Sequence, residues 1–84
     1  MISRFYCATS LVSAESIHAE GGIWNYGVGS KYVWSYYSHN EKYHTSTAIG
    51  RYRSESGSTK PGVEAQASAE KRWWWHNEAY YSVL

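Results

Sequence analysis

The sequence contains no aspartate, and it has only one cysteine, one proline and one phenylalanine among its 84 residues. The lone Cys7 excludes an intramolecular disulfide, although many secreted domains of this size are held together by several. No stretch approaches the ~20 apolar residues that a membrane-spanning helix needs. A formal net charge of +1 provides neither a basic face for nucleic-acid phosphates nor the cationic surface of a membrane-binding peptide. We therefore expect no nucleic-acid partner and no transmembrane segment.

Tyrosine and tryptophan are abundant instead, with 9 Tyr and 5 Trp. Each of these rings has a polar tip that needs a hydrogen-bond partner or water. A thin sheet structure, with ring tips at its rim, accommodates them better than a thick apolar core. Leucine is nearly absent after Ser13, and the remaining Val, Thr, Tyr and Trp favour strands over helices. The composition therefore predicts an all-β domain.

The character of the chain changes at the Ala19–Glu20 junction. Before it come one positive charge near the start, a mildly apolar run, and an ending with aliphatic Ile17 and small Ala19. A signal peptidase accepts such an ending. We predict that residues 1–19 are a signal peptide or leader remnant, cut between Ala19 and Glu20, and that residues 20–84 form the secreted, extracellular domain. A disordered tail is the alternative for residues 1–19.

After Glu20, short runs with alternating side chains are separated by turn-forming residues, a pattern that predicts antiparallel strands. On the strand expected over 31–38, Tyr32, Trp34 and Tyr36 share one face. The first three strands are expected to form a meander, and residues 54–62 a loop. The expected strands, about six in all, cover residues 23–28, 31–38, 42–53, 63–70, 73–76 and 79–84.

Residues 63–70 alternate between small apolar and polar side chains, as in a strand with one buried face. The inward residues would be Val63, Ala65, Ala67 and Ala69, and we expect rings of the first hairpin to pack over them. A helix over 63–72 is the alternative, because Ala, Glu and Lys favour helix. Six short strands in one flat sheet could not bury the rings. We therefore predict two packed antiparallel sheets, a small β-sandwich without disulfides.

Several short motifs follow one another in a particular order along the chain. They are Ala19-Glu20-Gly21, Trp24, Tyr26-Gly27, Ser35-Tyr36-Tyr37, His39, His44-Thr45-Ser46, Ala65 with Ala67, and Ala79-Tyr80-Tyr81. This ordered set resembles the lactococcin 972 family of bacteriocins. The resemblance implies a secreted β-sandwich from a Gram-positive bacterium that kills related bacteria. It implies binding of the cell-wall precursor lipid II and a block of septum formation without pores, with possible dedicated immunity or transport proteins in the producer.

Catalytic and metal-binding patterns find little support. A Ser-His-acid triad would need glutamate as its acid, and the serines are too frequent for any pairing to be informative. The glutamates fall in turns or on a solvated face, so paired-carboxylate chemistry is not expected either. His39, His44 and His76 are candidate zinc ligands, but their spacing matches no recognised site. We expect rim or turn histidines, no metal or other cofactor, and no enzymatic activity.

Two groups of residues are candidates for ligand binding. Trp74 is expected to face outward with Arg72 and His76, where an exposed ring beside a cation could stack on a sugar. Cover by the 54–62 loop is the alternative for Trp74. Arg51 and Arg53 would share one face of the 42–53 strand, and their guanidinium groups suit pyrophosphate oxygens. A solvated edge that discourages aggregation is the alternative for these arginines. A carbohydrate- or peptide-binding module without killing activity is the alternative function.

Overall fold

The computed structural model describes the backbone of residues 2–8, 13–72 and 77–84. Within these ranges all regular secondary structure is β, and the helix alternative for residues 63–72 is therefore wrong. None of the described residues forms a helix long and apolar enough to cross a membrane. The strands are β1 (Ile2–Ala8), β2 (Ser13–Ala19), β3 (Gly22–Val28), β4 (Tyr32–Ser38), β5 (His44–Ile49), β6 (Arg53–Glu55), β7 (Ala65–Glu70) and β8 (Asn77–Val83).

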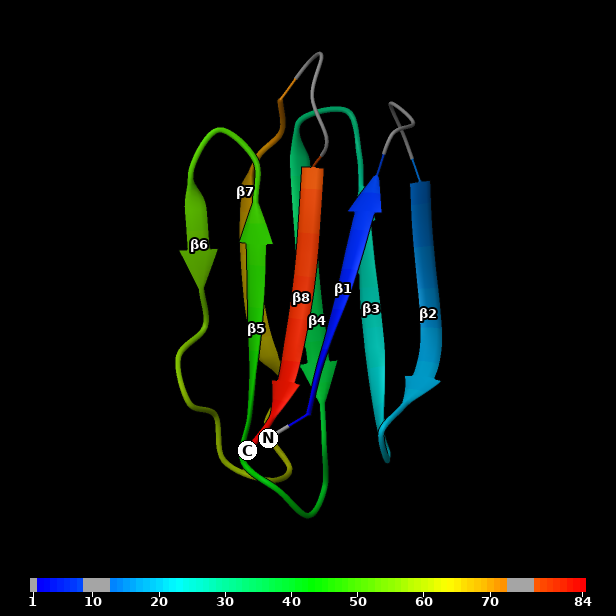
Figure 1. Ribbon diagram of the computed structural model, residues 1–84, viewed down its shortest axis with the longest axis vertical. Coiled ribbons are helices and arrows are strands. Elements are labelled where there is room, and N and C mark those ends of the chain that lie inside the picture. The colour runs from blue at the N-terminus through cyan, green and yellow to red at the C-terminus, as the bar shows by residue number, and fades with distance from the viewer. Residues whose placement is uncertain (1, 9–12, 73–76) are drawn as a thin grey trace.

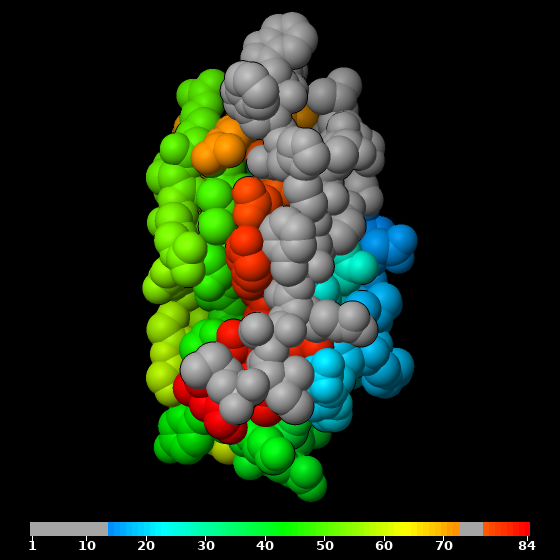
Figure 2. All heavy atoms as spheres, in the orientation of Figure 1, coloured from blue at the N-terminus to red at the C-terminus, as the bar shows by residue number. Residues whose placement is uncertain are grey.

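These strands form two four-stranded sheets that pack face to face (Figure 1). The front sheet has the order β1-β8-β5-β6, the rear sheet has the order β2-β3-β4-β7, and every pairing is antiparallel. The predicted small β-sandwich is confirmed. In the space-filling view, β6, β5 and β8 lie side by side on the near face, and atoms of β2 and β3 are visible along the right side (Figure 2). The outer face of the rear sheet points away from that viewer.

The predicted meander of the strands at 23–28, 31–38 and 42–53 is wrong, because of these only β3 and β4 are neighbours in one sheet. The next strand, β5, belongs to the other sheet, where it pairs with β8 and β6. In the rear sheet, β7 pairs with β4 and forms the edge of the sheet. The predicted 42–53 strand is also divided, since β5 ends at Ile49 and β6 begins at Arg53. A Cβ on Gly50 would overlap the backbone of Glu70, and the Arg51 N–H donates to the Glu70 carbonyl over 2.8 Å. The backbone of β7 therefore lies so close to Gly50 that only glycine fits at this position, where β5 has ended and the chain turns toward β6.

The side chains of β4 and β7 alternate between the two faces of the sheet as predicted. Val33, Ser35 and Tyr37 are buried, whereas the ring-bearing residues between them lie on the outer face. In β7 the alanines face inward, but Val63 precedes the strand and is 42% exposed, so its predicted burial is wrong. The last strand begins at Asn77 rather than after a turn at 77–78. The strand predicted over 73–76 lies outside the described residues.

Two apolar clusters fill the space between the sheets. The larger cluster combines rings from both sheets with small residues: Ala19, Trp24, Tyr26, Tyr37, Ala79, Tyr81 and Val83. In it Tyr37 stacks on Tyr81 with ring centroids 4.2 Å apart, and Trp24 meets Tyr81 edge-on at 4.8 Å. The smaller cluster contains Val28, Val33, Ala48, Ala67 and Ala69. Among the described residues, the side chains that cluster with Ala67 and Ala69 are therefore aliphatic, and this cluster contains no ring of the predicted first hairpin.

Candidate functional site

The two arginines predicted to bind pyrophosphate do not share a strand. Arg51 lies in the turn between β5 and β6, and Arg53 begins β6, so their predicted placement on one face of a 42–53 strand is wrong. The Arg51 guanidinium lies 3.7 Å from the Glu70 carboxylate, and both side chains are more than half exposed. Arg53 forms an exposed ion pair with Glu55, which raises the pKa of the Arg53 guanidinium through a hydrogen bond and charge attraction.

The second predicted group can be placed only in part, because Trp74 and His76 lie outside the described residues. Arg72 is half-buried after the end of β7. Its backbone N–H donates to Asn77 Oδ1 over 2.7 Å, and its carbonyl accepts from Asn77 Nδ2 over 3.3 Å. The buried Asn77 side chain thus ties the end of β7 to the start of β8 and fixes the backbone of Arg72.

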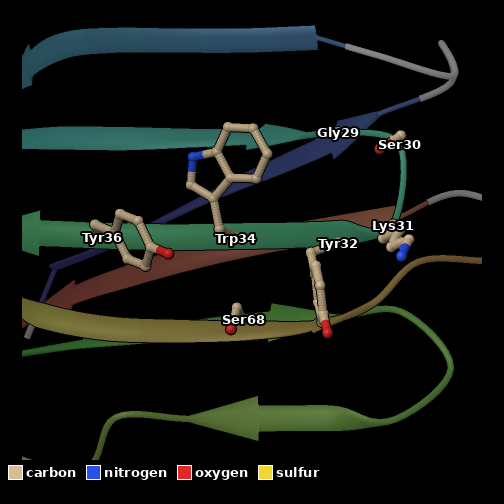
Figure 3. Close-up of a pocket in the computed structure, with 7 residues that line it drawn as sticks. All are labelled: Gly29, Ser30, Lys31, Tyr32, Trp34, Tyr36 and Ser68. Atoms are coloured by element: carbon tan, nitrogen blue, oxygen red, sulfur yellow. The ribbon is translucent and has the colours of Figure 1, made fainter.

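The outer face of the rear sheet carries a row of three rings that the sequence did not single out as a site. Tyr32, Trp34 and Tyr36 alternate along β4 and stand on the same side of it (Figure 3). The indole N–H of Trp34 donates to Asn25 Oδ1 on β3 over 3.0 Å, which fixes the orientation of the ring. Gly27 is opposite Trp34 on β3, and a Cβ on Gly29 would lie 3.3 Å from the indole. We call Tyr32, Trp34 and Tyr36 the aromatic row.

Two hollows adjoin each other at the end of the aromatic row. The first, of about 430 Å³, is formed by the aromatic row together with Gly29, Ser30, Lys31 and Ser68 (Figure 3). The second, of about 170 Å³, is formed by Lys31, Tyr32, Arg51, Glu70 and Lys71. Lys31 and Tyr32 belong to both. An aromatic hollow is therefore continuous with one that has three cations and a single carboxylate.

A cluster of buried side chains combines two histidines with a tyrosine: His39 and His44 flank the ring of Tyr37. His39 Nδ1 accepts from the backbone N–H groups of Glu41 and Lys42, each over 3.1 Å. The nitrogens of the fully buried His44 lie 2.8 Å from the Lys42 carbonyl and 2.7 Å from the Val63 carbonyl. The two imidazoles therefore contact backbone groups of the segment before β5 and of the segment before β7. The described residues contain no group of three metal-ligating side chains.

The Ala19–Glu20 junction contacts two members of this cluster, Tyr37 and His39. Glu20 and Gly21 have φ angles of 54° and 83° and form the tight turn between β2 and β3. His39 Nε2 lies 3.2 Å from the Glu20 carbonyl oxygen, and the Tyr37 hydroxyl donates to the Ala19 carbonyl over 2.8 Å. Burial, and next the Glu20 carboxylate, raise the pKa of Tyr37 above its ordinary value. The turn is therefore fixed by two side chains from the end of β4 and the residue after it.

The fold and this surface define a small disulfide-free β-sandwich with an aromatic outer face. Comparison with protein families then identifies the family: the model of the lactococcin 972 bacteriocins matches residues 20–81. The chain belongs to this bacteriocin family, and the resemblance predicted from the ordered motifs is confirmed. No curated protein and no solved structure matches the chain significantly.

Proposed function

We propose that residues 1–19 are a leader removed between Ala19 and Glu20, and that residues 20–84 are the secreted bacteriocin. The domain binds the cell-wall precursor lipid II of related Gram-positive bacteria and blocks septum formation without opening pores. The observation that carries this proposal is the match of the bacteriocin family model to residues 20–81, which begins where the leader is expected to end. The match supports the division of the chain as well as the antibacterial role.

The experiment starts from the culture supernatant of a Gram-positive host that expresses the full gene. We expect an intact mass that begins at Glu20, and inhibition zones when this product is spotted on lawns of related bacteria. Treated cells should elongate without septa and should exclude a membrane-impermeant dye, because cell-wall synthesis is blocked while the membrane stays closed. Rapid dye entry would contradict the mechanism, and the absence of inhibition on a broad panel would contradict the antibacterial function.

A second candidate function is a carbohydrate- or peptide-binding module without killing activity. The aromatic row favours it, because partly exposed rings on an outer sheet face provide a contact surface for flat, partly apolar ligands. Titration with glycans, followed by tryptophan fluorescence, distinguishes the two functions when combined with the killing assay. Glycan binding by a product that inhibits no strain would favour the module, whereas inhibition of growth would favour the bacteriocin.

A further inference from the structure

We propose that the two adjoining hollows at the end of β4 form one site for a glycosyl pyrophosphate. A sugar ring lies against Trp34 in the aromatic hollow, and the pyrophosphate lies against Lys31 and Arg51 in the basic one. The inference rests on the proposed function for the source of this ligand, the lipid-linked cell-wall precursor. It adds where the ligand binds and which part of it each residue contacts.

The aromatic half of the site suits a saccharide. The faces of aromatic rings are electron-rich, and the C–H bonds on one side of a sugar ring are polarised toward positive hydrogen, so the two surfaces attract each other. Trp34 is held in place by its hydrogen bond to Asn25, and its broad side is visible in Figure 3. Its neighbours on alternate positions, Tyr32 and Tyr36, follow at spacings of about 7 Å along the strand. Ser68 adds a hydroxyl beside the rings for the hydroxyl groups of a sugar.

The basic half of the site suits a phosphate group attached to that saccharide. Lys31 and Arg51 line the second hollow together with the buried Lys71 and the single carboxylate of Glu70. The ion pair between Arg51 and Glu70 is exposed and 3.7 Å long, so it is worth little in water. A dianionic pyrophosphate offers a guanidinium stronger, bidentate hydrogen bonds than this carboxylate does. Arg51 can therefore turn to the ligand at small energetic cost.

Because the aromatic and basic halves of the site share residues, the ligand that fits best is one that joins a sugar ring to an anionic group. Lys31 and Tyr32 contribute to both hollows, so a molecule that fills them has its anionic group directly attached to its ring. A neutral glycan would leave the cations unused, and an inorganic phosphate would leave the indole uncovered. A glycosyl pyrophosphate uses both halves at once. The first hollow lies on the outer face of the rear sheet, and the second lies at the end of the sandwich, where the turn between β5 and β6 meets the end of β7. A headgroup presented by a membrane can reach both.

The test compares the full chain with single variants for binding to phosphatidylcholine vesicles that contain either lipid II or undecaprenyl pyrophosphate, which lacks the sugars. For lipid II we expect Trp34→Ala to weaken binding about tenfold and Arg51→Ala about fivefold, the usual range for one important contact. On the sugar-free lipid, Arg51→Ala should keep its effect, whereas Trp34→Ala should have none. High salt should remove most of the Arg51 effect.

The matched control is Ile23→Ala, which truncates a side chain of β3 that is 49% exposed on the same sheet face, away from both hollows. It should bind both lipids as the parent chain does. Equal losses for Trp34→Ala on the two lipids would overturn the assignment of Trp34 to the sugar. If the parent chain binds lipid II and both site variants bind equally well, this site is wrong and the proposed function stands. If neither the full chain nor the secreted product binds lipid II, the proposed function itself is wrong.

Discussion

The hydroxyl of Tyr37 donates a hydrogen bond of 2.8 Å to the carbonyl oxygen of Ala19. This carbonyl belongs to the peptide bond at which we expect the leader to be removed. The Ala19 side chain is only 7% exposed, and the next two residues have the positive φ angles of a tight turn. A peptidase must place the small residue before the cut in its own pocket, which the buried and bonded Ala19 cannot enter. Cleavage therefore has to precede folding of the chain around this turn.

The first prediction is that the folded full chain resists signal peptidase at the Ala19–Glu20 bond, while the same chain held unfolded is cut. For Tyr37→Phe we expect cleavage of the folded chain to be about fivefold faster, because the loss of one hydrogen bond of ~1 kcal/mol makes local opening easier. Mass spectrometry of timed digests measures both rates.

Tyr43→Phe is the matched control for this experiment, because Tyr43 is 54% exposed and its substitution also removes one phenolic hydroxyl. Its cleavage rate should equal that of the parent chain. Equal cleavage of the folded and unfolded parent chains would show that the turn gives the junction no protection.

The second prediction concerns the stability of the fold at alkaline pH. Burial, followed by the charge of Glu20, raises the pKa of Tyr37 above its ordinary value of 10.0, so the folded chain holds the phenolic proton more tightly than the unfolded chain. The stabilisation is fully present below pH ~10 and is lost as the pH rises through the folded-state pKa. A phenolate also cannot donate to the Ala19 carbonyl.

Urea unfolding of the parent chain and Tyr37→Phe between pH 8 and pH 11, values about the ordinary phenol pKa of ~10, measures this effect. At the lower pH the variant should be less stable by about 1 kcal/mol, the typical contribution of one hydrogen bond. This difference should shrink toward zero as the pH rises. The other tyrosines titrate in both proteins, so only the difference reports on Tyr37. A difference that stays constant over the whole range would contradict the prediction.

The alternation of side chains predicted the faces of β4 and β7, because the direction of each side chain is a local property of an extended strand. The sheet to which β5 belongs is not a local property, since the residues of its partner β8 lie 29 to 39 positions further along the chain. The turn at Gly50 depends in the same way on the backbone of Glu70. These features could not be obtained from periodicity alone.

In the candidate site, too, the local features can be predicted from the sequence, whereas the contacts between distant segments cannot. The sequence predicts that Tyr32, Trp34 and Tyr36 share a face, but it does not show that this face lies outside the sandwich and meets a basic hollow. The sequence predicts a ligand-binding role for Arg51 from the chemistry of its guanidinium, and the structure brings Arg51 to that hollow through a turn rather than a strand. That Gly27 is opposite Trp34 follows only from the register of β3 and β4, which the sequence does not provide.

The third prediction concerns the hydrogen bonds that connect the two sheets through the core. The Trp24 indole N–H donates to Ser35 Oγ over 2.9 Å, and the Ser35 hydroxyl donates to the Tyr80 carbonyl over 2.7 Å. Ser35 is fully buried, so Ser35→Ala leaves the indole N–H without this acceptor and should reduce the free energy of unfolding by about 1–3 kcal/mol. Ser38→Ala, on the outer face of the same strand, should cost less than about 0.5 kcal/mol.

A double-mutant cycle with Trp24→Phe separates the hydrogen bond from simple loss of packing. Phenylalanine has no N–H to leave unsatisfied, so in that background Ser35→Ala should cost clearly less than in the parent chain. If the cost of Ser35→Ala is the same in both backgrounds, the bond from Trp24 to Ser35 contributes nothing to stability. The remaining cost would then come from the contact between Ser35 and the Tyr80 carbonyl, the part of the connection that reaches the second sheet.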